Sequence, residues 1–236
     1  MMREFILKYQ KVIPGRFLSR ANRFIAQCEI DGVIETVHVK NTGRLKELLV
    51  PGVPVYLELS DNPARKTRYS LIAVEKGERI VNIDSNAPNK VAVEALKEGS
   101  LQLTGMPDID LIRPEYRYGK SRFDIYLEGG GQKALMEIKG VTLEKDGIAM
   151  FPDAPTERGV KHVHELIAAR KEGYMAYILF VIQMKKLRCF MPNDETHRAF
   201  GDALRLAENN DVKILAYDCN VEHDGFTIAE PVRVVL

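Results

Sequence analysis

The chain has 236 residues, of which 45% are hydrophobic and 28% are charged, and its formal net charge is +1. This composition is that of a globular protein and excludes a disordered, collagen-like or coiled-coil chain. The near-neutral charge excludes a wholly basic nucleic-acid coat protein and a wholly acidic tail protein, but it allows parts of the chain to differ in charge. The length suits one large domain or two small ones.

Three features favour a cytoplasmic protein. The N-terminus is charged within its first five residues and has no apolar stretch long enough for a signal peptide. The longest apolar run, residues 174–182, is much shorter than the roughly 20 residues of a membrane span, so we expect no membrane partner. The cysteines lie far apart without CxxC spacing, which predicts reduced thiols rather than a disulfide framework or a zinc ribbon: Cys28, Cys189 and Cys219.

Residues 1–83 are expected to form a first domain of short strands. Five strands with one turn or two of helix at 45–49 predict an OB-like β-barrel, although an SH3-like barrel has a similar number of strands. Asp31 and Gly32 predict a hairpin turn between the first two strands. The expected strands are 24–30, 33–40, 53–59, 69–75 and 79–83.

From residue 84 to residue 236 the pattern changes to a mixed α/β domain. Helical spacing predicts three helices, at 86–99, 156–172 and 195–209. Strands are expected at 123–127, 134–138, 174–182 and 212–217. This alternation is typical of the α/β (α+β) class with a mixed sheet.

The charge divides in the same way as the predicted domains. Residues 1–80 carry 14 Lys+Arg against 9 Asp+Glu, so the excess of positive charge lies in the predicted barrel. OB barrels often hold single-stranded nucleic acid or oligosaccharide on one face. An ordinary solvated surface is the alternative interpretation.

The most informative segment is a predicted hairpin that carries Asp124, Glu137 and Lys139. On a strand, Glu137 and Lys139 point to the same face because they are two residues apart. Asp124 lies on the partner strand, across a loop of three glycines at 129–131. A loop centred on residue 130 pairs Asp124 with Met136, whereas one centred between residues 130 and 131 pairs it with Glu137. The residues alone leave both registers open.

If these side chains converge, they suit a divalent metal ion. Two carboxylates a few ångströms apart repel each other unless a cation lies between them, and hard ions such as Mg²⁺ or Mn²⁺ take oxygen ligands of this kind. Such an ion lowers the pKa of bound water and stabilises charge on a phosphate. Lys139 would orient or deprotonate the water, or stabilise charge in the transition state. Glu94 on the preceding helix is a further candidate acid, and the alternative for the Glu-x-Lys triplet is an ordinary surface pair.

Two basic segments are candidate nucleic-acid contacts. Arg44 and Lys46 belong to a predicted barrel loop and would contact phosphates. Arg158 and Lys161 begin a predicted helix, whose N-terminus with nearby cations suits a phosphate. The alternative for each segment is a solvated turn. Gln183 ends the apolar strand, where an ordinary polar residue is expected, with a place in the same cleft as the alternative.

The arrangement Asp…Glu-x-Lys across a hairpin, with a preceding helical acid, resembles the PD-(D/E)XK nuclease superfamily. More closely, the whole chain resembles the sugar fermentation stimulation protein A family. The matching segments are NTGR at 41–44, SRFD at 121–124, MEIKGVTL at 136–143 and FPDAPTERGVKH at 151–162.

This resemblance implies an N-terminal OB-like domain, a C-terminal nuclease-like domain and nucleic-acid binding. It carries over Asp124, Glu137 and Lys139 as the catalytic core, with Glu94 as the helical acid, and it favours the register in which Asp124 lies level with Glu137. Phe123 stands where the superfamily pattern has proline.

We therefore expect a nuclease that uses Mg²⁺ or Mn²⁺, held by Asp124, Glu137 and Glu94, to hydrolyse phosphodiester bonds in DNA, RNA or both. The alternative is a non-catalytic DNA-binding regulator of sugar metabolism, and a third interpretation is an oligosaccharide-binding protein. The sequence leaves the oligomeric state open, with a homo-oligomer among the alternatives.

Overall fold

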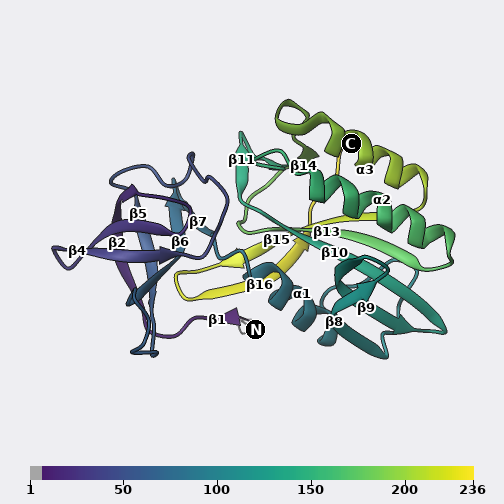
Figure 1. The fold of residues 1–236 in the computed structure, drawn as a ribbon, viewed down its shortest axis with the longest axis horizontal. Helices are drawn as coiled ribbons and strands as arrows, with labels where there is room; N and C mark the ends of the chain where they lie inside the picture. Colours follow the sequence, from purple (N-terminus) through teal and green to yellow (C-terminus); the bar gives the residue numbers. More distant parts are fainter. Residues whose placement is uncertain (1–6) are drawn as a thin grey trace.

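The computed structural model describes residues 7–236, which form a β-barrel followed by a three-layer α/β domain (Figure 1). The expectation that the N-terminus lacks a signal peptide falls on residues 1–6 and lies outside the described range. Across residues 7–236, no helix has the length and apolar character that crossing a membrane requires.

Five strands form the barrel in the order β4-β3-β2-β5-β6, and a parallel pairing between β4 and β6 closes it. A further strand, β7 (Arg79–Asn82), extends β6 as a hairpin. The predicted OB-like barrel is therefore confirmed. The barrel strands are β2 (Val12–Arg20), β3 (Ile25–Ile30), β4 (Val33–Val39), β5 (Pro54–Leu59) and β6 (Tyr69–Lys76).

The barrel differs from the prediction in its first strand. The sequence does not predict β2 because Pro14 and Gly15 interrupt it. In the structure a Cβ on Gly15 would lie 2.7 Å from the Leu57 side chain and 2.9 Å from the Glu29 carbonyl, so the strands approach too closely there for a side chain. Residues 45–49 form a single turn instead of a helix.

The second domain is built on a seven-stranded sheet in the order β1-β16-β15-β13-β10-β9-β8. The central strand β13 pairs in parallel with β10 on one side and with β15 on the other, and the other pairings are antiparallel. The mixed α/β class is confirmed. The strands are β1 (Leu7–Lys8), β8 (Leu111–Tyr118), β9 (Ser121–Gly129), β10 (Gln132–Val141), β13 (Met175–Ile182), β15 (Lys213–Val221) and β16 (Gly225–Pro231).

Helices cover both faces of this sheet. The helix α1 (Ala87–Lys97) packs on one face, and α2 (Glu157–Lys171) and α3 (Asp194–Asn209) pack on the other (Figure 1). A small sheet lies beside them in the order β11-β12-β14, formed by Leu143–Lys145, Ile148–Phe151 and Cys189–Pro192.

Two edge strands of the large sheet differ from the prediction. β1 pairs with β16, so residues 7–8 belong to the second sheet although the expected barrel domain spans 1–83. β8 is not predicted because Pro114 interrupts it and Glu115 has a positive φ of 54°. An edge strand tolerates proline because the missing N–H faces away from the ladder.

Polar contacts fix the two domains against each other. Glu144 of β11 pairs with Lys76 Nζ (2.6 Å) and Arg79 Nη1 (3.1 Å) of the barrel strands. Gln183, at the end of β13, donates from Nε2 to the carbonyl of Asn82 (3.0 Å). These contacts therefore hold the barrel and the second domain in a fixed arrangement at their boundary.

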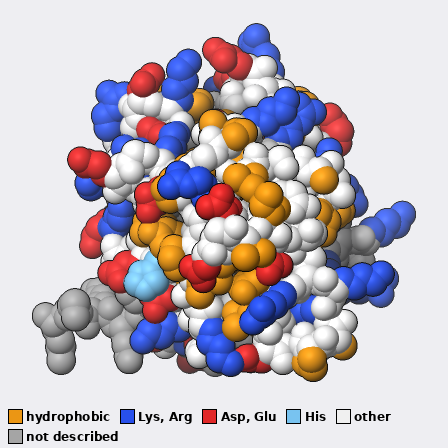
Figure 2. Space-filling model, turned by 90° about the vertical axis from the view of Figure 1, so that its left-hand side faces the viewer, with side chains coloured by type: hydrophobic (Ala, Val, Ile, Leu, Met, Phe, Trp, Pro, Cys, Tyr) orange, Lys and Arg blue, Asp and Glu red, His pale blue; other side chains and the backbone are white. Residues whose placement is uncertain are grey.

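Figure 2 shows the barrel end of the molecule, where basic side chains are mixed with acidic and apolar ones. The positive excess of the barrel is thus not gathered into one patch on this face. Exposed large apolar side chains of the barrel are Phe24, Val33, Ile34 and Val50.

Candidate active site

The β9–β10 hairpin brings Asp124 level with Glu137. The two turn residues, 130 and 131, have positive φ angles of 56° and 74°, which is the geometry of the two-residue turns that suit twisted strands. The last paired residues before the site are Ile125 and Met136, so Asp124 and Glu137 come next in the register. This is the register that the family resemblance favours.

The Asp124 carboxylate lies where β9 and β10 stop pairing. Its Oδ2 accepts a hydrogen bond from the backbone amide of Ile138 (2.7 Å), and its Oδ1 accepts one from Asn89 Nδ2 of α1 (2.8 Å). Burial, followed by the negative charge of Glu137, raises the pKa of Asp124 in spite of these hydrogen bonds. The two carboxylates therefore lie close enough to repel each other.

Glu137 is 4% exposed and has an uneven set of partners. Its Oε1 accepts hydrogen bonds from both Lys139 Nζ (2.5 Å) and His162 Nδ1 (2.6 Å). Burial alone would raise the pKa of Glu137, but the hydrogen bonds from His162 and Lys139 outweigh burial and lower it. Its other oxygen, Oε2, is buried and has no hydrogen-bond partner among residues 7–236. An ionised oxygen in that state is costly, and a bound cation or a hydrogen-bond donor would satisfy it.

Two cavities flank this cluster. One, of about 490 Å³, is lined by Asp124 together with Asn89, Glu94 and other residues of α1. The other, of about 420 Å³, is lined by His162 and is strongly basic. Its cations are Arg117, Lys120, Arg122, Arg158 and Lys161.

The structure brings most of the predicted site residues to this place. Asp124, Glu137 and Lys139 form the cluster, and Arg158 and Lys161 line the basic cavity beside it. The fold therefore gathers in one place residues that come from β9, β10 and the start of α2.

Three predicted residues lie further from the cluster. Glu94 shares a cavity with Asp124, but its side chain is 45% exposed and its carboxylate pairs with Lys97 Nζ (2.7 Å). Arg44 and Lys46 are exposed on the barrel and line neither flanking cavity.

Asn89 and His162 contact the carboxylates, a role that the sequence did not predict for them. His162 is 4% exposed and shares the buried face of α2 with Val163 and Leu166. A histidine at a core-facing position of an amphipathic helix is the signal that could have found it. No comparable pattern marks Asn89, which reaches Asp124 only because α1 packs against the sheet.

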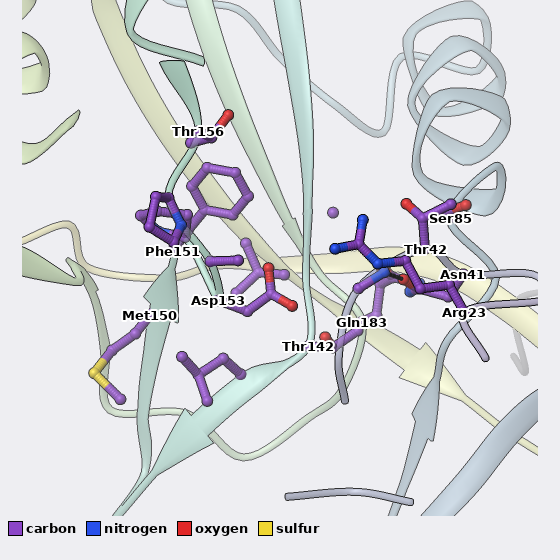
Figure 3. Close-up of a pocket in the computed structure, with 17 residues that line it drawn as sticks. Arg23, Asn41, Thr42, Ser85, Thr142, Met150, Phe151, Asp153, Thr156 and Gln183 are labelled. Carbon is purple, nitrogen blue, oxygen red and sulfur yellow. Dashed lines mark hydrogen bonds between the residues drawn. The ribbon is translucent and has the colours of Figure 1, made fainter. Parts of the chain in front are cut away.

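A third cavity, of about 310 Å³, lies between the two domains (Figure 3). It is lined by residues 41–43 of the barrel, by residues 140–143 and by residues 150–156. Gln183 lines this cavity and neither of the two that flank the carboxylates.

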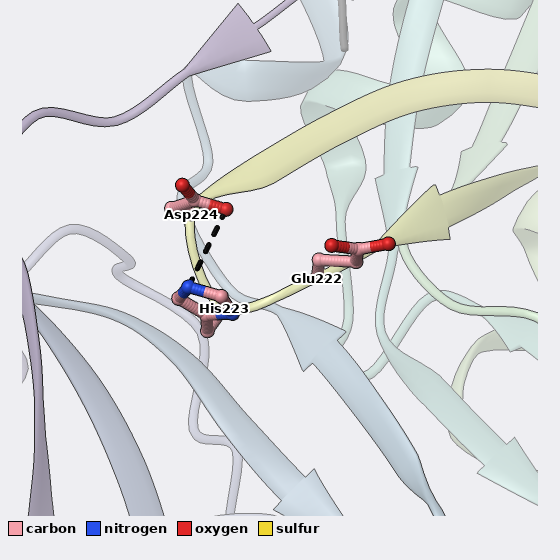
Figure 4. A group of neighbouring side chains, drawn as sticks. All are labelled: Glu222, His223 and Asp224. Atoms are coloured by element: carbon pink, nitrogen blue, oxygen red, sulfur yellow. Dashed lines mark ion pairs between the residues drawn. The ribbon is translucent and has the colours of Figure 1, made fainter. Parts of the chain in front are cut away.

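Within residues 7–236, one group of three adjacent metal-type side chains is found, formed by Glu222, His223 and Asp224 (Figure 4). Their ligand atoms lie within 4.8 Å of one another at the turn between β15 and β16. Glu222 and His223 are exposed, and His223 Nε2 lies 3.7 Å from Asp224 Oδ1. Exposed acidic turns of this kind are common on protein surfaces, so we assign this one no function.

Family models match both parts of the chain. A model described as the SfsA N-terminal OB domain matches residues 18–83, and one described as the sugar fermentation stimulation protein RE domain matches residues 86–225. The chain belongs to the sugar fermentation stimulation protein (SfsA) family. The resemblance drawn from the sequence motifs is therefore confirmed.

SfsA relatives are similar to this chain over its whole length. The sugar fermentation stimulation protein homologs of Clostridium beijerinckii and Desulfitobacterium hafniense are each 53% identical over 98% of this chain, and the matches span 100% and 99% of those relatives. Among solved structures, SfsA of Pyrococcus furiosus in complex with Ca²⁺ is similar, with 28% identity and a TM-score of 0.89. That match covers 99% of this chain and 100% of the other.

Proposed function

We propose that this member of the SfsA family is a divalent-metal-dependent nuclease that hydrolyses phosphodiester bonds in DNA, RNA or both. The observation that carries the proposal is the buried Oε2 of Glu137, which has no hydrogen-bond partner among the described residues. Glu137 itself lies level with Asp124 across the hairpin. A bound cation would satisfy this oxygen and reduce the repulsion that raises the pKa of Asp124.

The donor set suits Mg²⁺ or Mn²⁺, which take carboxylate oxygens and keep several waters. Asp124 and Glu137 would hold the ion, and Glu94 would join them if its pair with Lys97 opens. When bound, the ion would lower the pKa of a coordinated water and stabilise negative charge on the phosphate. The Ca²⁺ in the structure of the Pyrococcus furiosus relative supports a hard cation with oxygen ligands.

The other residues of the cluster have distinct proposed roles. Lys139 donates a hydrogen bond to Glu137, so its ammonium is suited to orienting water or stabilising phosphate charge rather than to removing a proton. His162 is a positioning residue, because it holds the Oε1 side of the Glu137 carboxylate and leaves Oε2 to the ion.

Nucleic acid would be held on both sides of this cluster. Arg158 and Lys161 are the proposed phosphate contacts in the basic cavity, and the strand would continue toward Arg44 and Lys46 of the barrel. Cations in these positions favour a polyanion over a neutral sugar chain, and binding to nucleic acid would therefore weaken as salt is raised.

The test is cleavage of labelled DNA and RNA in Mg²⁺, Mn²⁺ or EDTA. Asp124→Ala and Lys139→Ala are compared with Asp61→Ala and Lys213→Ala, which remove the same charges at positions outside the cluster. We expect metal-dependent cleavage that the first pair abolishes and the second pair retains. Cleavage that survives EDTA or both active-site substitutions would contradict the mechanism.

The alternative is a nucleic-acid-binding regulator without hydrolysis, since the names of the relatives speak of stimulation and do not mention cleavage. Binding without cleavage in every metal would support it. Two carboxylates facing the phosphates would weaken a pure binding protein, and for this reason we prefer the enzyme.

A further inference from the structure

The cavity between the domains has a preorganised wall on the barrel side. The guanidinium of Arg20 donates hydrogen bonds at 2.6–3.2 Å to five backbone carbonyls of two loops, those of Asn22, Arg23, Asn41, Gly43 and Arg44. These contacts fix the backbone of Arg23, while no hydrogen bond or ion pair ties its own side chain to another described residue. Figure 3 shows the Arg23 guanidinium pointing into the cavity.

The opposite wall carries a carboxylate that is also unpaired. Asn193 fixes the loop before it, donating from N to the Phe151 carbonyl (2.8 Å) and from Nδ2 to the Pro152 carbonyl (3.0 Å). Asp153 points across the cavity toward Arg23 (Figure 3), and no ion pair joins the two among the described contacts. Opposite charges that face each other without pairing leave room for a ligand with donors on one edge and acceptors on another.

Gly43 and Gly140 keep this cavity open. A Cβ on Gly43 would lie 2.8 Å from Asp153 Oδ2, so the glycine gives the carboxylate its place. A Cβ on Gly140 would lie 2.6 Å from Gln183 Oε1. Both close approaches occur at the cavity lining, where a larger residue would displace a polar group.

Gln183 contributes a third fixed polar group. The side chain is 1% exposed, and its Nε2 donates to the Asn82 carbonyl (3.0 Å), the Asn82 side-chain oxygen (2.9 Å) and the Asp84 carbonyl (3.2 Å). Because backbone carbonyls cannot donate, the amide cannot be turned over, and Oε1 is the atom left beside Gly140. No hydrogen bond to this oxygen is found among the described residues, and it adds an acceptor to the cavity lining.

We propose that this cavity binds one unpaired nucleobase of the nucleic-acid strand, and that guanine fits it best. The proposal rests on the proposed function, because a nuclease brings a strand to this place. Guanine has two adjacent acceptors, O6 and N7, which match an arginine fork, and two adjacent donors, N1–H and N2–H, which match a carboxylate. Adenine, cytosine and uracil each lack the adjacent pair of donors.

The volume of the cavity and its apolar lining residues are compatible with a single planar base. Its volume of about 310 Å³ is at the small end of ligand cavities. Met150 and Phe151 give part of its lining an apolar character, as in pockets that bind an extruded base.

The cavity also lies close to the carboxylate cluster. Residues 140–142 follow Lys139 directly on and after β10, which places Thr142 about 10 Å along the strand from Lys139. The bound base would therefore belong to a nucleotide near the scissile phosphate. Cleavage would accordingly favour a phosphodiester bond close to guanine.

The test is calorimetric titration of the full chain with GMP, AMP, CMP and UMP in EDTA, which measures binding without hydrolysis. We expect GMP to bind at least about tenfold more tightly than each of the other three nucleotides. Arg23→Ala and Asp153→Asn should each weaken GMP binding about tenfold or more. Arg198→Ala and Asp61→Asn remove the same charges from exposed positions outside the cavity and should leave it unchanged.

A second format covers weak binding of mononucleotides. Fluorescence anisotropy in EDTA compares an oligothymidine with the same strand carrying one central guanine or one central adenine. The absence of a guanine preference in both formats, or a preference that survives Arg23→Ala and Asp153→Asn, would overturn the inference.

Asp124→Ala separates this inference from the proposed function. The variant should keep the guanine preference while losing cleavage. If the wild type binds guanine but shows no metal-dependent cleavage, the proposed nuclease activity is contradicted and the base site is supported. If it cleaves nucleic acid without a guanine preference, the base site is contradicted and the nuclease activity is supported.

Discussion

Two buried glutamates, Glu137 at 4% exposure and Glu144 at 7%, lie on the consecutive strands β10 and β11 of two different sheets and have opposite surroundings. Glu144 has partners on both oxygens, with Lys76 Nζ at 2.6 Å on Oε2, and Arg79 Nη1 (3.1 Å) and the Gly147 amide (2.5 Å) on Oε1. Burial would raise the pKa of Glu144, but these hydrogen bonds lower it to about 2. Glu137 has two donors on Oε1, and within the described part of the chain it has none on Oε2.

The difference separates a structural carboxylate from the one that we propose as a metal ligand. Glu144 is fully satisfied by the chain itself and joins the second domain to the barrel. Glu137 is satisfied on one side only, and its free oxygen lies beside a second carboxylate whose pKa is raised. Substitutions of the two residues should therefore affect different properties.

The largest expected effect is on catalysis. Glu137→Gln keeps the shape of the side chain but removes the charge that would hold the metal ion, and we expect the cleavage rate to fall about a thousandfold. Glu144→Gln is the matched control and should cleave at nearly the wild-type rate per folded molecule. Single-turnover cleavage measures both, and equal losses in the two variants would remove the distinction.

The next effect is on stability. Glu144→Ala leaves Lys76 and Arg79 without their carboxylate partner, and we expect the free energy of unfolding to fall by about 3 kcal/mol. Urea unfolding followed by circular dichroism measures this change. Asp124→Ala should cost less, because it also removes a carboxylate that burial and Glu137 destabilise. A larger loss in Asp124→Ala than in Glu144→Ala would contradict the comparison.

The pH dependence of the free energy of unfolding should also reflect Glu144. The pKa of Glu144 is about 2 in the folded protein, below its ordinary value of 4.5, so its contribution is complete above about pH 4.5 and is lost as the pH falls toward 2. We expect this residue to account for a loss of about 2 kcal/mol between pH 5 and pH 3. The wild type and Glu144→Gln should therefore converge in stability over that range. Parallel curves would show that Glu144 is not the titrating group.

The smallest expected effect comes from the residue that positions Glu137. His162→Ala removes one donor from Oε1 and frees the carboxylate to rotate, so we expect the affinity for Mn²⁺ to fall about tenfold. His162→Gln offers a replacement donor and should recover part of the loss. Unchanged affinity in both variants would show that the contact does not orient the carboxylate.

The sequence predicted the residues of the site better than their partners. Spacing along one strand predicted that Glu137 and Lys139 share a face. The residues alone left the register of Asp124 open, and the family resemblance favoured the register that the structure has. His162 and Asn89 reach the carboxylates from α2 and α1, and those contacts depend on how the helices pack on the sheet.

The same reason explains the limits of the fold prediction. The OB-like barrel and the α/β domain followed from periodicity, but β2 and β8 did not, because Gly15 and Pro114 break the pattern at positions that only the neighbouring strands explain. The interdomain contacts of Glu144 join residues that are distant in the chain, and no local pattern marks them.

The most direct test of the proposed metal site is calorimetric titration of the protein with Mn²⁺ in the absence of nucleic acid. We expect binding at the carboxylate cluster that Glu137→Gln and Asp124→Asn each abolish and that Glu144→Gln retains. Binding of equal affinity in the wild type and in Glu137→Gln would contradict it, because the free oxygen of Glu137 would then not be a metal ligand.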